Sequence, residues 1–288
     1  MPVRTGSPMS SGDPLRSTSM SYADVNGLSL YYQEQGSGGE PLIMLHGGFG
    51  TGDSFGPVLD ELADSRRVIA ADLQAHGGTA DIGRPLRFET MADDIAGLIG
   101  QLGLEHADVL GISLGGGVAL RLAIQHPHLV RRLVVVSAPA KRDGWYPEVR
   151  AGFDAMGRQL EPMFRQSPLY TAYAKVAPRV EDFPVLIDKV GDCTRQDYDW
   201  TAEIAAITAP VMLVYADADS VSPAHIAEFY ALLGGGLQDG HWDGSTRSAT
   251  RLAIMPGHVH TDVLTAPGLA GAVSTFLDAP VLVPPPMG

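Results

Sequence analysis

The chain has 288 residues, of which 45% are hydrophobic, and a formal net charge of −13 at pH 7. This length and apolar content allow one large core, so we expect a single domain or a domain with an insertion. The acidic balance and the lack of a Lys/Arg cluster argue against a nucleic-acid partner, because phosphate binding needs clustered positive charge. No apolar stretch approaches the roughly 20 residues of a membrane span, so we expect no membrane partner.

The two ends of the chain have the composition of tails. Residues 1–20 are rich in Ser, Pro and Gly and lack the apolar run of a secretory signal. We therefore expect a disordered N-terminal tail and, by default, a cytoplasmic protein. Residues 280–288 contain three consecutive prolines, which end regular structure, and predict a second tail. Cys193 is the single cysteine, so it forms no internal disulfide, and we interpret it as a spectator.

Between the tails, short apolar runs alternate with helix-length segments. Tyr22–Val25 and Leu28–Gln33 flank an Asn-Gly pair, which indicates a β-hairpin. Further strands are predicted at Pro41–Leu45, Val68–Ala71, Ala107–Ile112, Leu133–Val136, Val211–Tyr215 and Leu252–Met255. Helices are predicted at Phe55–Ala63, Glu89–Leu102, Leu114–Gln125, Pro223–Leu233 and Pro267–Leu277. Strands that are apolar on both faces predict an α/β fold, with a mostly parallel central sheet flanked by helices.

The alternation stops at residues 139–207, which are rich in Arg, Tyr, Met and Pro and have helical periodicity. Such a segment between two core strands predicts an inserted helical cap. The expected organisation is thus a core of residues 21–138 and 208–279, interrupted by the cap. A second departure is the Gly-rich segment 234–245, which is longer than most connections. It could serve as a lid or as an interface element.

One motif carries chemistry. Gly111-Ile112-Ser113-Leu114-Gly115 joins a predicted strand to a predicted helix, which is the context of a Gly-x-Ser-x-Gly nucleophile elbow. Glycine on either side removes the Cβ atoms that would clash in so sharp a turn. The helix N-terminus then faces a developing oxyanion. A phosphate-binding loop is excluded because no Gly-Lys-Ser/Thr follows. The motif predicts Ser113 as a nucleophile.

With two further segments, the chain resembles the α/β-hydrolase family over nearly its whole length. His46–Gly50 (HGGFG) is similar to the oxyanion loop of that family. Asp72–Gly77 (DLQAHG) is similar to its D-x-x-G-H-G segment, with Ala75 where glycine is usual. The resemblance implies the α/β-hydrolase fold with an inserted helical cap. It also implies an oxyanion hole formed by the backbone N–H groups of Gly48 and Leu114, with Phe49 as the alternative to Gly48.

A serine nucleophile needs a base that is itself oriented by an acid. In the family these follow in the order Ser, Asp/Glu, His. Asp219 matches the family's D-x-V-x-P segment, and we assign the neighbouring Asp217 to turn hydrogen bonds at the strand end.

Two histidines compete for the role of base. His258 directly follows Gly257, but the family's P-G-x-x-H form places the base four residues after Pro256, at His260. The resemblance therefore implies the triad Ser113, Asp219 and His260. It leaves His258 at a solvent-exposed loop position.

These residues imply a serine hydrolase that cleaves a carboxylic ester or lactone through an acyl-enzyme. We expect Phe49, Trp145 and Tyr146 to line an apolar pocket for a small hydrophobic substrate. No cofactor is expected, and no metal, because the histidines lack metal-ligand spacing. The alternatives are a C–C bond hydrolase or a perhydrolase-like enzyme with the same triad. A ligand-binding protein on the same fold is disfavoured, because a binder needs no complete triad. The sequence leaves the oligomeric state open.

Overall fold

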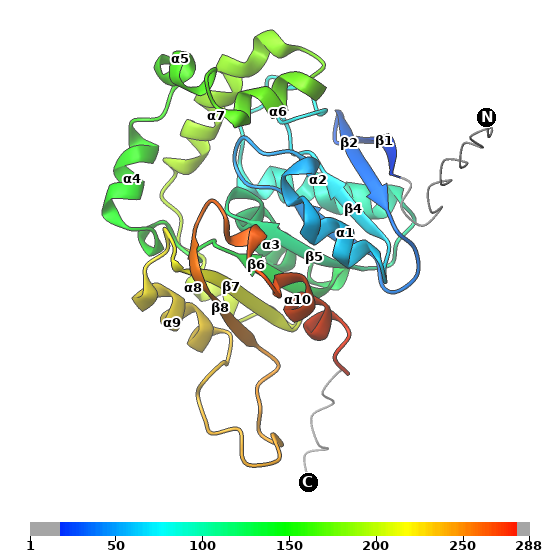
Figure 1. The fold of residues 1–288 in the computed structure, drawn as a ribbon, viewed down its shortest axis with the longest axis vertical. Coiled ribbons are helices and arrows are strands. Elements are labelled where there is room, and N and C mark those ends of the chain that lie inside the picture. Colours follow the sequence, from blue (N-terminus) through cyan, green and yellow to red (C-terminus); the bar gives the residue numbers. More distant parts are fainter. Residues whose placement is uncertain (1–17, 281–288) are drawn as a thin grey trace, which may run out of the picture.

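The computed structural model describes residues 18–280 (Figure 1). Most of both predicted tails lies outside this range. The first strand, β1, begins at Ser19, two residues before the predicted start of the core. Within residues 18–280, no helix is both long and apolar enough to cross a membrane.

An eight-stranded sheet in the order β1-β2-β4-β3-β5-β6-β7-β8 forms the centre of the protein. The predicted hairpin pairs β1 with β2, and β2 is also antiparallel to β4. All other neighbouring strands are parallel, which confirms the predicted mostly parallel sheet. The strands are β1 (Ser19–Val25), β2 (Leu28–Gln35), β3 (Leu42–Leu45), β4 (Val68–Ala71), β5 (Ala107–Ile112), β6 (Val130–Val136), β7 (Val211–Ala218) and β8 (Arg251–Val259).

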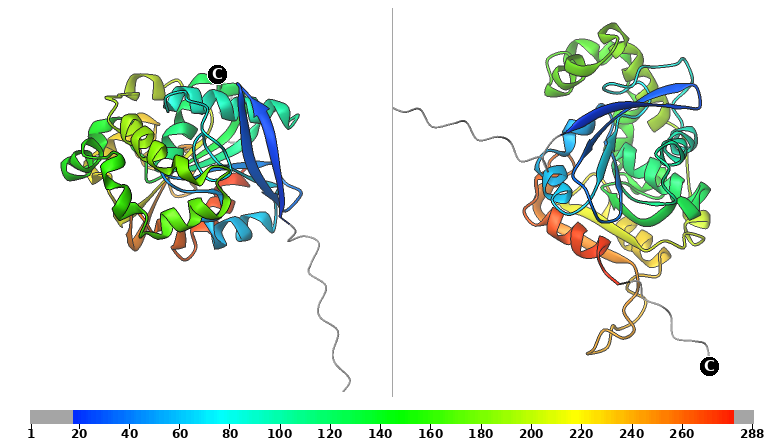
Figure 2. Two further views of the ribbon diagram at one scale, coloured as in Figure 1. Left: turned by 90° about the horizontal axis from the view of Figure 1, so that it is seen from above. Right: turned by 90° about the vertical axis from the view of Figure 1, so that its right-hand side faces the viewer.

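Helices cover both faces of this sheet (Figure 2). On one face lie α1 (Pro57–Ala63) and α10 (Leu269–Leu277), and on the other α2 (Phe88–Gln101), α3 (Leu114–Gln125) and α9 (Pro223–Leu232). Successive side chains of a strand point to opposite faces, so Val109 and Leu110 of β5 belong to different hydrophobic clusters. Burial of both faces explains why the central strands read as continuous apolar runs.

The segment between β6 and β7 is helical and stands beyond the carboxyl ends of the parallel strands (Figure 1). Phe183 is its centre, since the rings of Phe164, Tyr170 and Tyr173 all pack on it. The helices are α4 (Pro147–Asp154), α5 (Glu161–Phe164), α6 (Pro168–Val176), α7 (Phe183–Thr194) and α8 (Thr201–Ile204). This is the segment for which a cap was predicted, and we keep that name for residues 139–207.

The neck of the cap is closed by backbone hydrogen bonds. The N–H of Arg142 donates to the carbonyl of Tyr198 at 2.8 Å, and the N–H of Trp200 donates to that of Ala140 at 3.0 Å. The chain therefore leaves the core and returns to it at adjacent points.

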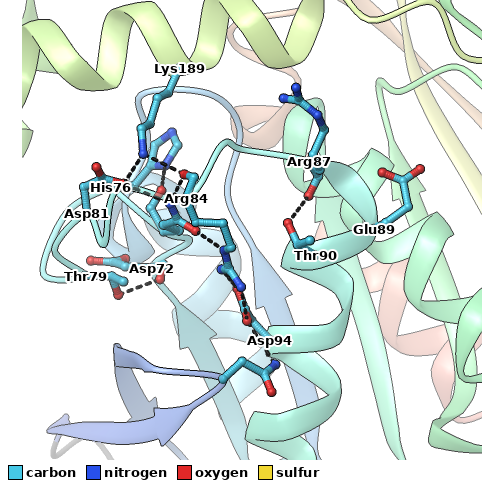
Figure 3. A network of polar contacts seen from close by, with 12 residues as sticks. Asp72, His76, Thr79, Asp81, Arg84, Arg87, Glu89, Thr90, Asp94 and Lys189 are labelled. Atoms are coloured by element: carbon cyan, nitrogen blue, oxygen red, sulfur yellow. Dashed lines mark hydrogen bonds and ion pairs between the residues drawn. The ribbon is translucent and has the colours of Figure 1, made fainter.

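A second attachment joins α7 to the loop that follows β4 (Figure 3). The Lys189 ammonium donates to the Asp81 carboxylate and to the Arg84 carbonyl, each at 2.6 Å. Both charged side chains are mostly buried, with 13% and 9% exposed. Burial alone would raise the pKa of Asp81, but hydrogen bonds from Lys189 and Gln74 outweigh it and lower that pKa. The pair therefore fixes α7 above the sheet.

The Gly-rich segment joins α9 to β8 and projects from the end of the protein opposite the cap (Figures 1 and 2). It enters β8 at that strand's amino end, whereas Ser113 follows the carboxyl end of β5. The lid interpretation of this segment is therefore wrong. The side chain of Trp242, near its tip, is fully exposed.

Candidate active site

Ser113 occupies a sharp turn between β5 and α3, with φ 53° and ψ −117°. A Cβ atom on Gly111 would lie 2.1 Å from the Gly115 carbonyl oxygen, and one on Gly115 would lie 2.2 Å from that of Leu45. Any larger residue would therefore force the backbone apart at either position. The two glycines and the strained serine are the geometry that the motif predicts.

The structure brings the three predicted triad residues together. The Oγ atom of Ser113 lies 3.0 Å from Nε2 of His260, and Nδ1 of His260 lies 3.1 Å from Oδ1 of Asp219. The three residues follow the carboxyl ends of β5, β7 and β8, which meet at one edge of the sheet. This arrangement allows the imidazole to accept the serine proton while the carboxylate orients the ring.

The Asp219 carboxylate is 8% exposed and well supplied with donors. Its Oδ2 accepts from the Ser137 hydroxyl at 2.5 Å and from the Ala216 N–H at 3.0 Å, and Oδ1 accepts from the Val221 N–H at 3.2 Å. Burial alone would raise the pKa of Asp219, but the hydrogen bonds from His260, Ser137 and Ala216 outweigh it and lower that pKa. The group is therefore an ionised acceptor at neutral pH. Ser137 was not predicted from the sequence, although its place directly after β6 was the available signal.

Ser137→Ala is expected to lower kcat about three- to tenfold and the free energy of unfolding by about 2 kcal/mol, because one charge-assisted hydrogen bond is lost. A lowered carboxyl pKa stabilises the fold above the ordinary value of about 3.9 and ceases to do so as the pH falls through the folded-state pKa. The stability difference between wild type and variant should therefore be full at pH 7 and shrink below about pH 3.9. Urea unfolding across pH measures it. An equal difference at every pH would contradict this role of Ser137.

The two competing residues have other partners. The Asp217 carboxylate accepts from the backbone N–H groups of Gly257 at 2.9 Å and of His258 at 3.3 Å, so it joins β7 to β8. His258 lies within β8, its side chain is only 16% exposed, and its Nδ1 is 3.4 Å from Asp262. The expected solvent-exposed loop position is thus wrong, because β8 continues to Val259.

The loop after β3 lies against the nucleophile, since a Cβ on Gly47 would be 3.4 Å from that of Ser113. His46 holds this loop: its Nδ1 donates to the Gly47 carbonyl at 2.7 Å, and its Nε2 accepts from the Leu73 N–H at 3.0 Å. Burial lowers the pKa of His46 to about 3, which keeps the ring neutral and suits this tautomer. Because the peptide is trans, the Gly48 N–H points away from the carbonyl that His46 holds.

The second predicted oxyanion donor belongs to the start of α3. Leu114 is the first residue of the helix, so its N–H has no acceptor within the helix. Gly48, Phe49 and Leu114 all line the same cavity as Ser113. Phe49 has φ 63° and packs on Phe164 of the cap at 4.7 Å between ring centroids.

The cavity beside Ser113 has a volume of about 140 Å³ and is mainly apolar. None of its lining residues carries a charge. Of the predicted pocket residues, Phe49 and Trp145 line it, and the Trp145 ring lies 5.5 Å from the His260 ring. Tyr146 does not line it, which corrects the prediction. Trp145 has an extended backbone, so the next side chain points the other way. The lining also includes Phe88, Gly117, Ala138, Pro139, Phe153, Met156, Val190, Thr194 and Tyr198.

Several of these lining residues were not predicted from the sequence. Phe88, Val190 and Thr194 lie on helices whose pattern indicated only packing, and Tyr198 lies in an irregular segment. No local signal marks such positions, because the cavity forms only when α2 and the cap meet over Ser113.

The described residues contain no group of three or more His, Cys, Asp or Glu side chains placed to hold a metal ion. Cys193 is buried on α7, and burial raises its pKa to about 12, so it is not a thiolate at neutral pH.

Comparisons with known proteins identify the family that the chain resembles. A family model described as alpha/beta hydrolase fold matches residues 40–171. The chain is 31% identical to a putative carbamate hydrolase of Azorhizobium caulinodans, over 76% of this chain and 87% of that protein. It is 28% identical to a pimeloyl-[acyl-carrier protein] methyl ester esterase of Yersinia pseudotuberculosis, over 83% and 93%. The solved structure of E-2-(acetamidomethylene)succinate hydrolase matches with a TM-score of 0.69 at 22% identity, over 91% of this chain and all of that one.

Proposed function

The chain belongs to the α/β-hydrolase family, and from this premise we propose that it is a serine hydrolase that cleaves a neutral carboxylic ester or lactone through an acyl-enzyme. The observation that carries the proposal is the pair of contacts at 3.0 Å and 3.1 Å that join Ser113, His260 and Asp219 in the order that nucleophilic catalysis needs.

The reaction begins when Oγ of Ser113 attacks the carbonyl carbon and its proton passes to Nε2 of His260. Asp219 holds the imidazole in the required tautomer and stabilises its positive charge. The N–H groups of Gly48 and Leu114 bind the tetrahedral oxyanion. The C–O bond then breaks, and His260 gives the proton to the departing alcohol oxygen. A water deprotonated by His260 attacks the acyl-enzyme, and the carboxylic acid leaves as Ser113 regains its proton.

The cavity supports a neutral, largely apolar acyl group. It lacks a charged side chain that could pair with an anionic group, and aromatic rings form much of its wall. A methyl ester esterase among the relatives supports an ester as the scissile group. A carbamate ester is a second candidate, because the carbamate hydrolase relative covers most of the chain and a carbamate presents the same carbonyl to Ser113.

The test is a panel of short and medium acyl esters, lactones, carbamates and amides with the purified full chain. We expect turnover of neutral esters or lactones above amides. A fluorophosphonate probe should modify one serine, identified by peptide mass spectrometry as Ser113. Labelling at another serine, or no turnover of any ester, lactone or carbamate, would refute the proposal.

A further inference from the structure

We propose that Tyr198 is a specificity residue of this site, whose hydroxyl donates a hydrogen bond to an oxygen atom in the acyl part of the substrate. The preferred acyl group would be neutral and would carry a ketone or ether oxygen beyond the scissile carbonyl. The inference rests on the proposed ester or lactone hydrolysis and specifies its substrate class.

Tyr198 is firmly placed at the cavity wall. Its ring stacks on Trp200 with 4.4 Å between centroids and lies 5.3 Å from the ring of Phe88. Its backbone carbonyl belongs to the neck of the cap, where it accepts from Arg142 at 2.8 Å. Packing and backbone both fix the side chain before any substrate binds, which is what a selective contact requires.

The hydroxyl proton of Tyr198 is not used in a hydrogen bond within the described part of the protein. Its oxygen accepts from Nε1 of Trp145 at 3.2 Å, and because an indole N–H can only donate, the phenol proton plays no part in that bond. Among residues 18–280 the Tyr198 hydroxyl donates no hydrogen bond to a protein acceptor. A phenylalanine would leave the indole N–H of Trp145 without an acceptor, so the Tyr198 oxygen is committed to that bond while its proton stays available. Burial also raises the pKa of Tyr198, so the group keeps its proton at neutral pH.

Trp145 connects the Tyr198 hydroxyl to the reacting groups of the site. Trp145, which holds it, also lines the cavity, and the indole ring lies 5.5 Å from the imidazole of His260. One aromatic side chain thus lies between the candidate base and the Tyr198 hydroxyl. A substrate whose carbonyl is at Ser113 would extend its acyl chain along this wall.

The other polar groups of the cavity do not compete for this role. Thr194 donates its single hydroxyl proton to the carbonyl of Val190 at 2.9 Å or of Gly191 at 3.2 Å. The indole N–H of Trp145 is engaged with Tyr198. Apart from Ser113, Tyr198 is thus the one side chain lining the cavity with an uncommitted donor. A lone donor in an apolar, uncharged wall selects a neutral acceptor rather than an anion.

The experiment compares three matched pairs of p-nitrophenyl esters: pentanoate with 4-oxopentanoate, hexanoate with 5-oxohexanoate, and heptanoate with 6-oxoheptanoate. The ratio of kcat/KM for oxo over alkyl ester is measured for wild type, for Tyr198→Phe, and for Thr194→Val as the matched control. In at least one pair the ratio should fall about three- to tenfold in Tyr198→Phe and stay unchanged in Thr194→Val. Differences in the intrinsic reactivity of the esters affect this ratio equally in every enzyme, so they cancel when the ratios of wild type and variants are compared.

Equal ratios in wild type and Tyr198→Phe for all three pairs would overturn the inference while the proposed function stands. Failure of wild type to hydrolyse any of the esters would instead count against the proposed function. Should Tyr198→Phe not fold, wild-type ratios are divided by the ratios of alkaline hydrolysis rates of the same esters. A quotient above three in one pair supports the contact, and a quotient of about one in all pairs overturns it.

Discussion

Replacing Ser113 with alanine is expected to lower kcat for the best ester by about 10⁴-fold or more, because the attacking oxygen is removed. The fold should persist, since alanine carries the same Cβ atom through the strained turn at φ 53°. Activity that remains would come from binding and from the oxyanion loop alone.

The measurement is steady-state hydrolysis by wild type and variant, with melting temperature as the check on folding. Ser29→Ala is a matched control, because it removes the same hydroxyl from an exposed position on β2. Turnover by Ser113→Ala within tenfold of wild type would show that another group performs the attack.

The second large effect separates the two neighbouring histidines. His260→Ala should lower kcat by about 10³–10⁴-fold, because Ser113 loses the base 3.0 Å from its oxygen. His258→Ala should change kcat less than about threefold, because its imidazole faces Asp262 and has no contact with Ser113. Each variant is the matched control for the other, since both delete an imidazole from the same stretch of chain.

Kinetics of both variants on one ester, with circular dichroism to confirm folding, decide between the histidines. If His258→Ala were the inactive variant and His260→Ala retained turnover, the spacing argument for the base would be wrong. A loss in both would indicate that the end of β8 had moved rather than that a base was missing.

The sheet could be predicted because its signals are local. The runs at β4 and β5 and the helix α3 have the bounds that the sequence indicated, since short apolar runs and the Gly-flanked serine mark their ends. The resemblance to the α/β-hydrolases implied Ser113, Asp219 and His260 as one group, and these three side chains lie within hydrogen-bond distance of one another in the order Ser113, His260, Asp219. Local patterns suffice wherever neighbours in sequence set the conformation.

The remaining features depend on residues that are distant in sequence. Ser137 follows β6 and bonds Asp219 at the end of the neighbouring strand β7, 82 positions later in the chain, and Phe88 meets Tyr198 only once the cap is in place. The prediction that Tyr146 lines the pocket was wrong because neighbouring side chains of an extended backbone point to opposite sides, and Trp145 faces the cavity. These contacts are products of tertiary packing, which no window of the sequence contains.

Ala75 stands where the family pattern has glycine, and its backbone conformation shows the strain that this replacement causes. It has φ 66° and is 5% exposed, so an L-residue occupies the left-handed region where glycine is favoured. Such a residue costs roughly 1–2 kcal/mol. The surrounding loop is held by the Asp72 side chain, whose two oxygens accept the N–H groups of Gly52 and Gly78, each at 2.7 Å.

The closed neck of the cap has a consequence for how such a protein can diversify. Because Ala140, Arg142, Tyr198 and Trp200 fasten the two crossings of the chain to each other, residues 143–197 form a cassette whose ends are already joined. Its length and sequence can change without moving the points where the chain leaves β6 and returns to β7, provided that the contacts of residues 144–146 with residues 220–222 and of Lys189 with Asp81 are kept. The cavity lining can therefore change through cassette residues such as Phe153, Met156 and Val190, while the strand ends that hold Ser113, Asp219 and His260 stay in place. Tyr198 lies just outside the cassette, so an exchange of residues 143–197 would leave it unchanged.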